Sequence, residues 1–408
     1  EKKNYKYFLE NIIKSHKKIF KISNSFYFLF SNLLNSAFIP FLLIFQVLLN
    51  NSELGAEIGV FPGIVLLLTQ VFSANARSLF LYNDKREFYI KTINTRLLVG
   101  LLITGAVIFY HYFFYQTENF TLLTIISFIV YLSWVNEMNL SLHEKNNSVL
   151  MIKIFFFINF IFYFVLALGL VLSPDIPLKI MFLNLLELKI FLLAYLVLHF
   201  FFIIYHFDYV RTGVNSIKKF NFEVFRLESS LMSSFFSILS VIIWRISLIS
   251  LTGKSNAGIF FAAFAIASFP GTLFNNIAGQ ILIMNKKIRN FFSEYSSYFS
   301  FGYLSFLMIT FYLNRNFFHE ISLYKFFDTT LISLLGTYFM LISLYDRHIY
   351  LSMGKSFQQK IFIRDIIYSI SIMPIIGVLF IFGGNEYLVL SYLLSSIFAL
   401  FFYKIFKL

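Results

Sequence analysis

Residues 97–115 read LLVGLLITGAVIFYHYFFY, a run without a single Asp, Glu, Lys or Arg. A helix needs roughly 20 mainly apolar residues to cross the hydrocarbon core of a membrane. Runs of the same kind recur from Phe26 to Tyr403. Because these runs are continuous, whereas strands that cross a membrane alternate apolar and polar side chains, the sequence predicts spanning helices.

The composition of the whole chain supports the same fold class. Hydrophobic residues make up 59% of the 408 residues and charged residues 13%, and the mean hydropathy is +0.76. Soluble globular domains carry about 25% charged residues. We therefore expect an all-α polytopic membrane protein with about 12 transmembrane helices in two six-helix repeats.

The chain divides into apolar spans and short polar segments. Residues 1–25 are expected to be a basic cytoplasmic segment that leads into the first span, and not a cleavable signal peptide. An N-terminal six-helix lobe over 26–207, a cytoplasmic linker over 208–226 and a C-terminal six-helix lobe over 227–408 follow. The expected spans are Phe26–Leu49, Ile58–Leu81, Leu97–Tyr115, Leu122–Leu142, Ile154–Leu172, Lys189–Phe207, Leu227–Leu251, Ile259–Met284, Tyr298–Leu313, Thr330–Leu351, Ile366–Phe382 and Tyr387–Tyr403.

The basic residues indicate how the chain is oriented. With the amino terminus in the cytoplasm, the cytoplasmic segments hold 25 of the 33 Lys and Arg residues, the outer segments hold 5 and the spans hold 3. Such an excess in alternate segments follows the positive-inside rule. The net charge of +13 therefore reflects membrane topology and not a nucleic-acid partner. We expect a multi-pass membrane protein with both termini cytoplasmic.

The two halves of the chain repeat each other. The first two spans are expected to turn through Ser52–Gly59, and the seventh and eighth through Lys254–Phe260. Ser133–Glu137 in the fourth span lines up with Ser343–Arg347 in the tenth. Two halves with the same topology are related by an axis along the membrane normal, as in transporters built from parallel repeats.

The sequence lacks the usual signals of catalysis. It has no cysteine, so disulfides and thiolate metal sites are excluded. No zincin, P-loop or nucleophile-elbow motif is present, and the expected loops are short. We expect no catalytic residue, no cofactor and no metal, and therefore not an enzyme. A membrane enzyme of glycan assembly, such as a polymerase or ligase, stays open as an alternative because Arg315 and His319 precede the tenth span.

Arg245 is the sharpest candidate for a site residue. It lies deep in the seventh span, with no acidic residue within one helical turn. Charged groups inside a membrane are costly, so they face a water-filled cavity or a partner. Arg245 could line a cavity and hold an anionic headgroup, or it could bond to carbonyls or to Glu137 of another helix.

Four further charged residues lie within the expected spans. Arg77 either faces water or a neighbouring helix, or extends to the cytoplasmic surface. Glu137 and Asp346 could each carry a coupling proton or sodium ion, or serve as the counter-charge for Arg245 or Arg77. Arg347 follows Asp346 directly, so the two side chains point in different directions on a helix.

The remaining candidates lie near span ends or on one helix face. Arg364 opens the eleventh span, as an interfacial anchor or a cavity residue. Arg96 and Lys153 begin spans from the inside, and we expect both to extend to the surface. His199 and His206 are seven residues apart and are expected to line a polar seam or reach the interface, since two histidines are a weak metal signal.

The segments Trp244–Leu248, Gly253 and Ala257–Ser268 together carry a resemblance to a known family. They contain a charged residue, an apolar run, a small-residue turn, Gly-Ile-Phe and an Ala-rich helix. In this they resemble the start of the second half of Wzx-type polysaccharide flippases, in the multidrug/oligosaccharidyl-lipid/polysaccharide superfamily. In the first half, Glu53–Gly55 lacks the aromatic residue that commonly follows the glycine in that family.

The resemblance implies a transporter that moves a polyprenyl-diphosphate-linked oligosaccharide outward through a cationic cavity between two lobes. It implies Arg245 and Arg77 as substrate-binding residues, with Arg347 and Arg364 as further candidates. Membrane lipids and a glycan polymerase are the implied partners. Guanidinium groups suit a diphosphate, and an inside-negative potential favours outward movement of an anion by about 2.3 kcal/mol per charge per 100 mV. A cation or drug antiporter of the same superfamily is the alternative.

Overall fold

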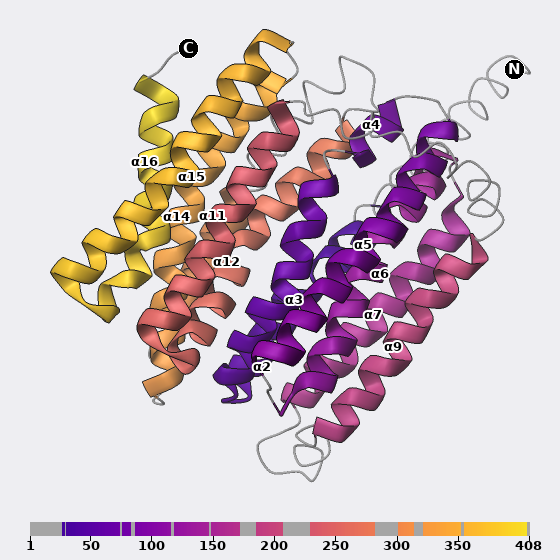
Figure 1. Ribbon diagram of the computed structural model, residues 1–408, viewed down its shortest axis with the longest axis horizontal. Coiled ribbons are helices and arrows are strands. Elements are labelled where there is room, and N and C mark those ends of the chain that lie inside the picture. The colour runs from indigo at the N-terminus through magenta and orange to yellow at the C-terminus, as the bar shows by residue number, and fades with distance from the viewer. Residues whose placement is uncertain are drawn as a thin grey trace, which may run out of the picture.

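The computed structural model describes residues 27–28, 30–73, 76–82, 86–115, 118–146, 148–171, 185–206, 229–281, 301–313, 321–351 and 355–405. In these ranges the regular secondary structure is entirely helical (Figure 1). The helices are α2 (Phe38–Leu48), α3 (Ser52–Ser73), α4 (Ala76–Tyr82), α5 (Arg86–Phe114), α6 (Phe120–Lys145), α7 (Val149–Val171), α9 (Leu185–Tyr205), α11 (Ser229–Thr252), α12 (Lys254–Ile281), α14 (Ile321–Leu351), α15 (Lys355–Gly383), the 3-10 helix η4 (Asn385–Leu390) and α16 (Ser391–Ile405). The predicted segments 1–25 and 208–226 lie outside the described residues.

Several helices are long and apolar enough to cross a membrane. Within the described ranges they are α3, α6 and the greater part of α5, α7 and α9. The helical segment Phe30–Ser36 and α2 together pass the same test, with a bend of 57° between them. The predicted first span is therefore a broken helix, and the break lies at Ala37.

The N-terminal lobe, defined here as α2 to α9, is built around α6. Helix α6 contacts α3, α5, α7 and α9, and its side chains are buried on nearly every face, including Asn136 and Asn139. By contrast, α5 exposes large apolar side chains such as Leu102, Phe109 and Phe114. Exposed apolar surface of this kind is expected where a helix faces lipid tails.

The C-terminal lobe, defined here as α11 to α16, packs mainly through α12 on α14, α11 on α15, and α14 on α16 (Figure 1). Small and hydroxyl residues bring these helices close together. Gly336 of α14 lies against the ring of Tyr392, and the indole nitrogen of Trp244 donates a hydrogen bond to Ser391 Oγ at 2.8 Å. Close contact through small residues and interhelical hydrogen bonds is how helices associate inside a membrane.

The two lobes meet along α3. This helix contacts α11 and α12, and α2 also contacts α12. One apolar cluster runs through the contact and includes Phe61 and Val65 of α3 with Trp244, Leu248 and Phe261 of the C-terminal lobe. Any movement of one lobe against the other must therefore act on α3.

The two predicted turns are wrong in position. Ser52–Gly59 is helical in α3, and the chain turns before it at Leu49–Asn51, where Asn50 has a φ of 58°. Lys254–Phe260 is helical in α12, and the turn is made at Gly253, with a φ of 79° that favours glycine. The other glycines of these segments allow helices to approach closely, and they do not form turns.

Two predicted helix boundaries also differ from the structure. The predicted second span begins at Ile58, whereas α3 begins at Ser52 and covers Ser52–Ser73, and α4 covers Ala76–Tyr82. The predicted third span begins at Leu97, whereas α5 begins at Arg86. Hydropathy detects the apolar part of a helix and misses a polar extension that continues past it.

Candidate functional site

Arg245 lies at the contact between the lobes. It projects from α11, its residue surface is 7% exposed, and its Nη1 donates a hydrogen bond to the carbonyl of Gly59 at 2.5 Å. The guanidinium carbon lies 5.5 Å from the ring centroid of Phe261. Of the two predicted interpretations, the structure shows the bond to a carbonyl.

The sequence of α3 makes room for this guanidinium. Pro62 has no N–H to donate to the carbonyl of Ile58, so it interrupts the hydrogen-bond ladder one residue before Gly59. A Cβ atom on Gly63 would overlap Arg245 Nη1, and one on Gly59 would overlap the ring of Phe261. Because Gly59 and Gly63 have no side chains, Phe261 and Arg245 of the other lobe can pack directly against the backbone of α3.

Further polar contacts join the lobes near the two turns. Glu57 of α3 is buried, and its carboxylate accepts hydrogen bonds from Lys254 Nζ at 3.0 Å and from Asn119 at 3.2 Å. The hydroxyls of Ser52 and Ser255 lie 2.9 Å apart. Since Lys254 and Ser255 belong to α12, these bonds must break if the lobes separate at this end.

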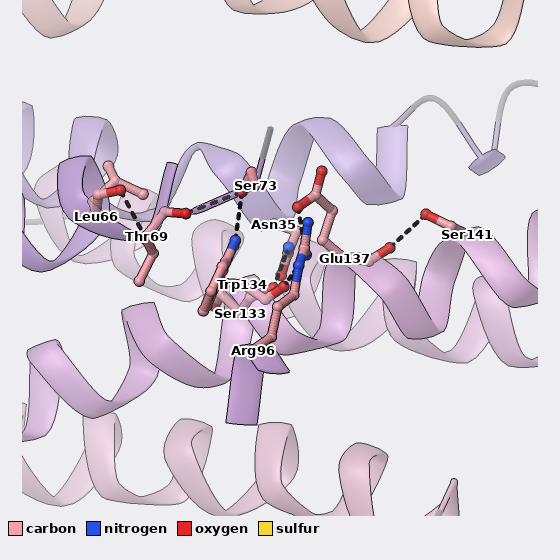
Figure 2. Close-up of polar contacts among 9 residues, drawn as sticks. All are labelled: Asn35, Leu66, Thr69, Ser73, Arg96, Ser133, Trp134, Glu137 and Ser141. Carbon is pink, nitrogen blue, oxygen red and sulfur yellow. Dashed lines mark hydrogen bonds and ion pairs between the residues drawn. The ribbon is translucent and has the colours of Figure 1, made fainter. Parts of the chain in front are cut away.

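A second charged cluster lies inside the N-terminal lobe (Figure 2). Arg96 of α5 is 1% exposed, and its Nη1 donates to the carboxylate of Glu137 at 2.8 Å and to the carbonyl of Trp134 at 2.6 Å. The guanidinium also lies over the Trp134 ring, 4.9 Å from its centroid. The indole nitrogen donates in turn to Ser73 Oγ at 2.5 Å, which connects the cluster to the end of α3.

The expected surface position of Arg96 is therefore wrong. Because α5 begins at Arg86, Arg96 lies well inside the helix and cannot extend to its end. Its Nε and Nη2 atoms are buried and have no hydrogen-bond partner. The sequence did not identify Arg96 as the partner of Glu137, because Arg96 directly precedes the apolar run 97–115 and therefore resembles a basic residue at a span end.

Arg77 is also paired with an acid. It lies on α4, and its Nη2 atom is 3.0 Å from the carboxylate of Glu144 near the end of α6. Both side chains are largely buried. One of the two alternatives for Glu137, a counter-charge for Arg245 or Arg77, is wrong, because Glu137 pairs with Arg96.

His199 of α9 and His206, which directly follows α9, lie in a polar seam, one of the two predicted positions. Asn136 of α6 donates to the carbonyl of His199 at 3.1 Å, and its amide also lies 3.2 Å from His199 Nδ1. His206 Nε2 lies 2.6 Å from Nε2 of His143 on α6. In the described part of the chain, no group of three or more His, Cys, Asp or Glu residues is placed to hold a metal ion.

The other candidate side chains lie outside what the structure describes. Asp346 and Arg347 fall on α14 and Arg364 on α15, but only the helical backbone is described there. Arg315 and His319 lie in the undescribed residues 314–320.

Among the described buried charged residues, one cation has no acidic partner. Glu57 and Glu144 are the buried acids, and each has a cationic partner at 3.0 Å. Arg96 is paired with the partly exposed Glu137. Among the described side chains no acid forms an ion pair with Arg245. Among the described side chains, the lobe contact therefore holds a surplus positive charge.

No family model and no curated protein matches this chain. Solved structures match it over most of its length. One is the inward-facing conformation of a multidrug resistance MATE family transporter of the MOP superfamily, with 15% identity, 91% of this chain and 92% of that chain covered, and a TM-score of 0.55. The outward-facing conformation of such a transporter matches with 14% identity, 92% and 93% coverage, and a TM-score of 0.56. The chain has the MATE fold.

The MATE fold confirms the predicted fold class, an all-α polytopic membrane protein of about 12 helices in two six-helix repeats. The same fold occurs in a MOP superfamily transporter from Pyrococcus furiosus, with 13% identity, 92% and 93% coverage, and a TM-score of 0.50. Its structure is described by a binding pocket of reverse polarity that suggests a different function. The MATE fold alone thus leaves the charge of the substrate open.

Proposed function

We propose that this protein is a flippase that moves a polyprenyl-diphosphate-linked oligosaccharide across the bacterial inner membrane by alternating access. The MATE fold supports the mechanism, because similar structures are described in inward-facing and outward-facing conformations. The lobe contact along α3 supplies the boundary across which such a change would act.

The surplus charge of Arg245 is the observation that carries the proposal. An unpaired charge in a low-dielectric interior costs several kcal/mol. Removing one partner of a buried ion pair, for example, destabilises a protein by about 3–5 kcal/mol. A diphosphate would supply the missing negative charge, and the planar fork of arginine binds phosphate oxygens in pairs. We propose Arg245 as the main headgroup residue, and Arg347 and Arg364 as further ones.

Arg77 and the acids take different roles in this proposal. Arg77 would have to leave Glu144 before it could bind substrate, so we rank it below Arg245. Glu137, whose side chain is 31% exposed, is the described acid best placed to exchange a coupling ion, with Asp346 as its counterpart in the second half. A glycan polymerase acting beside the protein would consume the lipid-linked product.

Transport in proteoliposomes tests the proposal. The substrate is a labelled polyprenyl-diphosphate oligosaccharide, and the variants are Arg245→Ala and Arg245→Lys, with Ile246→Ala as a control because Ile246 is exposed on the same helix. We expect Arg245→Ala to slow transport by about 10-fold or more, since a hydrogen bond to a charged group contributes about 1.5–3 kcal/mol. Arg245→Lys should retain part of the rate.

Two results would contradict the proposal. Full transport by a folded Arg245→Ala variant would make Arg245 a structural residue. No transport by the intact protein would favour the second candidate, a cation or drug antiporter. That candidate is supported by the partly exposed carboxylate of Glu137 and by neighbours described as multidrug resistance transporters. It predicts that cationic dyes move against a proton or sodium gradient and that Glu137→Gln stops them.

A further inference from the structure

Three glycines of α3 form a stripe that borders the contact between the lobes. Gly55, Gly59 and Gly63 are spaced by four residues, which places them on one face of the helix. A Cβ atom on Gly59 would overlap the Phe261 ring of α12, and one on Gly63 would overlap Arg245 of α11. A Cβ atom on Gly55 would be in ordinary contact with Gln46 and Leu43 of α2, with Gly258 of α12 at 4.0 Å. We call Gly55, Gly59 and Gly63 the glycine stripe. Such small-residue faces let helices approach closely within a membrane.

The contact is close on the partner helix as well. A Cβ atom on Gly258 would overlap the carbonyl oxygen of Ser52 and press on the backbone of Ala56. The Ser52–Ser255 and Glu57–Lys254 bonds lie at the same end of α3 and α12. At this point the lobes are therefore held by backbone contact and a few polar bonds, beside the apolar cluster that also crosses the contact.

Arg245 has an incomplete set of partners in this contact. Its Nη1 donates to the neutral carbonyl of Gly59, while its Nε is buried without any acceptor. A phosphate oxygen pair is a charged acceptor, with hydrogen bonds roughly twice as strong as neutral ones. It would also give Nε a partner. A phosphate group therefore competes favourably with the Gly59 carbonyl for the same guanidinium.

We propose that the glycine stripe is a reversible latch between the lobes, and that a phosphate-bearing lipid releases it by taking the Arg245 guanidinium from the Gly59 carbonyl. This inference rests on the proposed function in one respect, the phosphate-bearing substrate. Because the anion binds Arg245 better when the latch is open, it shifts the equilibrium toward the open state. The coupling is reciprocal, so a weaker latch must bind the anion more tightly.

The lack of cysteine in this chain allows a direct test. In the double variant Ser52→Cys and Ser255→Cys, the two sulfur atoms would replace hydroxyls that lie 2.9 Å apart. A disulfide can then form only between the introduced residues, and its rate under mild oxidation reports the closed latch. The probe is a short prenyl diphosphate added to the full-length purified protein, and the matching prenyl alcohol controls for the lipid chain.

We expect the diphosphate to slow cross-linking by about fivefold or more, the lower end of typical coupling between sites, and the alcohol to have no effect. Arg245→Gln should abolish the response. Gly63→Ala, whose methyl group would displace the guanidinium, should slow cross-linking without any ligand and bind the diphosphate more tightly. Gly105→Ala is the matched control, because nothing lies within 4 Å of the added methyl group.

An unchanged rate with diphosphate would overturn the inference, and so would an equal response in Arg245→Gln. If Arg245→Gln does not fold, Gly63→Ala tests the inference instead, and slower cross-linking without tighter diphosphate binding in that variant would overturn it. Transport separates this inference from the proposed function. Oxidised protein that still transports the lipid-linked oligosaccharide would overturn the latch alone, whereas reduced protein that never transports it would overturn the proposed function alone.

Discussion

Arg96 shows how a single residue can organise a lobe. Its guanidinium joins Glu137, the Trp134 carbonyl and the Trp134 ring, and through the indole it reaches Ser73 at the end of α3. Removing one partner of a buried pair is costly because the remaining charge stays desolvated. The pair therefore specifies how α5 sits against α6.

We expect Glu137→Gln to destabilise the protein by about 3 kcal/mol, the lower end of the range for a broken buried pair, because Glu137 is partly exposed. Thermal unfolding in detergent measures this loss. Glu87→Gln is the control, since Glu87 is exposed on the same helix as Arg96. Equal unfolding temperatures for the two variants would mean that the pair contributes nothing to stability.

The charged residues of the site could be recognised from the sequence, but their pairing could not. Arg245 and Glu137 were recognisable because each is a charge inside an apolar run. Which charge meets which depends on helix packing, and nothing in the spacing of Arg96 and Glu137, 41 residues apart, encodes it. The assignment of Arg96 to a span end followed from placing the helix start at Leu97.

Helices α5 and α6 meet through a close contact at Gly100. A methyl group there would overlap the ring of Tyr131 and crowd Trp134, whereas Gly105, five residues on, has open space around it. The Tyr131 hydroxyl donates to the carbonyl of Leu97 at 3.0 Å, so the ring is also tied to α5. The two glycines thus have different reasons to be present on one helix.

Substitution by alanine should have opposite effects at these two positions. We expect Gly105→Ala to stabilise the protein by about 0.5–1 kcal/mol through helix propensity. Gly100→Ala should destabilise it by about 1–3 kcal/mol, because overpacking outweighs that gain. Thermal unfolding of both variants is the measurement. A stabilised Gly100→Ala variant would show that Tyr131 moves aside freely.

Element positions followed from hydropathy only in part. The long apolar helices α6 and α7 lie where their predicted spans lie, because apolar length determines them. The turns were misplaced, because Gly55, Gly59 and Gly258 suggested flexibility where they provide close packing. A glycine in a sequence does not distinguish these two uses, and only the partner helix does.

At the scale of the whole molecule, two helical lobes meet along α3 in the MATE fold, and Arg245 lies at their contact without an acid among the described side chains. The twelve-helix repeat could be predicted because each span leaves its own apolar signal and the basic segments fix the alternation. The lobe contact could not be predicted, since it joins residues as far apart as Gly59 and Arg245, 186 positions away.

The membrane potential should act on the proposed transport. An inside-negative potential favours outward movement of an anion by about 2.3 kcal/mol per charge per 100 mV. Imposing a potassium diffusion potential on proteoliposomes should accelerate outward movement of the lipid-linked substrate, and reversing the potential should slow it. A rate that does not depend on potential would mean that no net charge moves in the step that limits transport.

The ion pairs also imply an order of biosynthesis. In the N-terminal lobe the cations are made first, because Glu137 follows Arg96 by 41 residues and Glu144 follows Arg77 by 67. Until α6 has been synthesised, both arginines lack their acids, so a nascent chain that ends after α5 would hold unpaired charges at the insertion site. Arg245 is in the opposite position, since the Gly59 carbonyl is already in the membrane when α11 leaves the ribosome. The ion pairs of the N-terminal lobe can therefore form only after α6 has been inserted. By contrast, Arg245 of α11 enters the membrane when its acceptor, the Gly59 carbonyl, is already there.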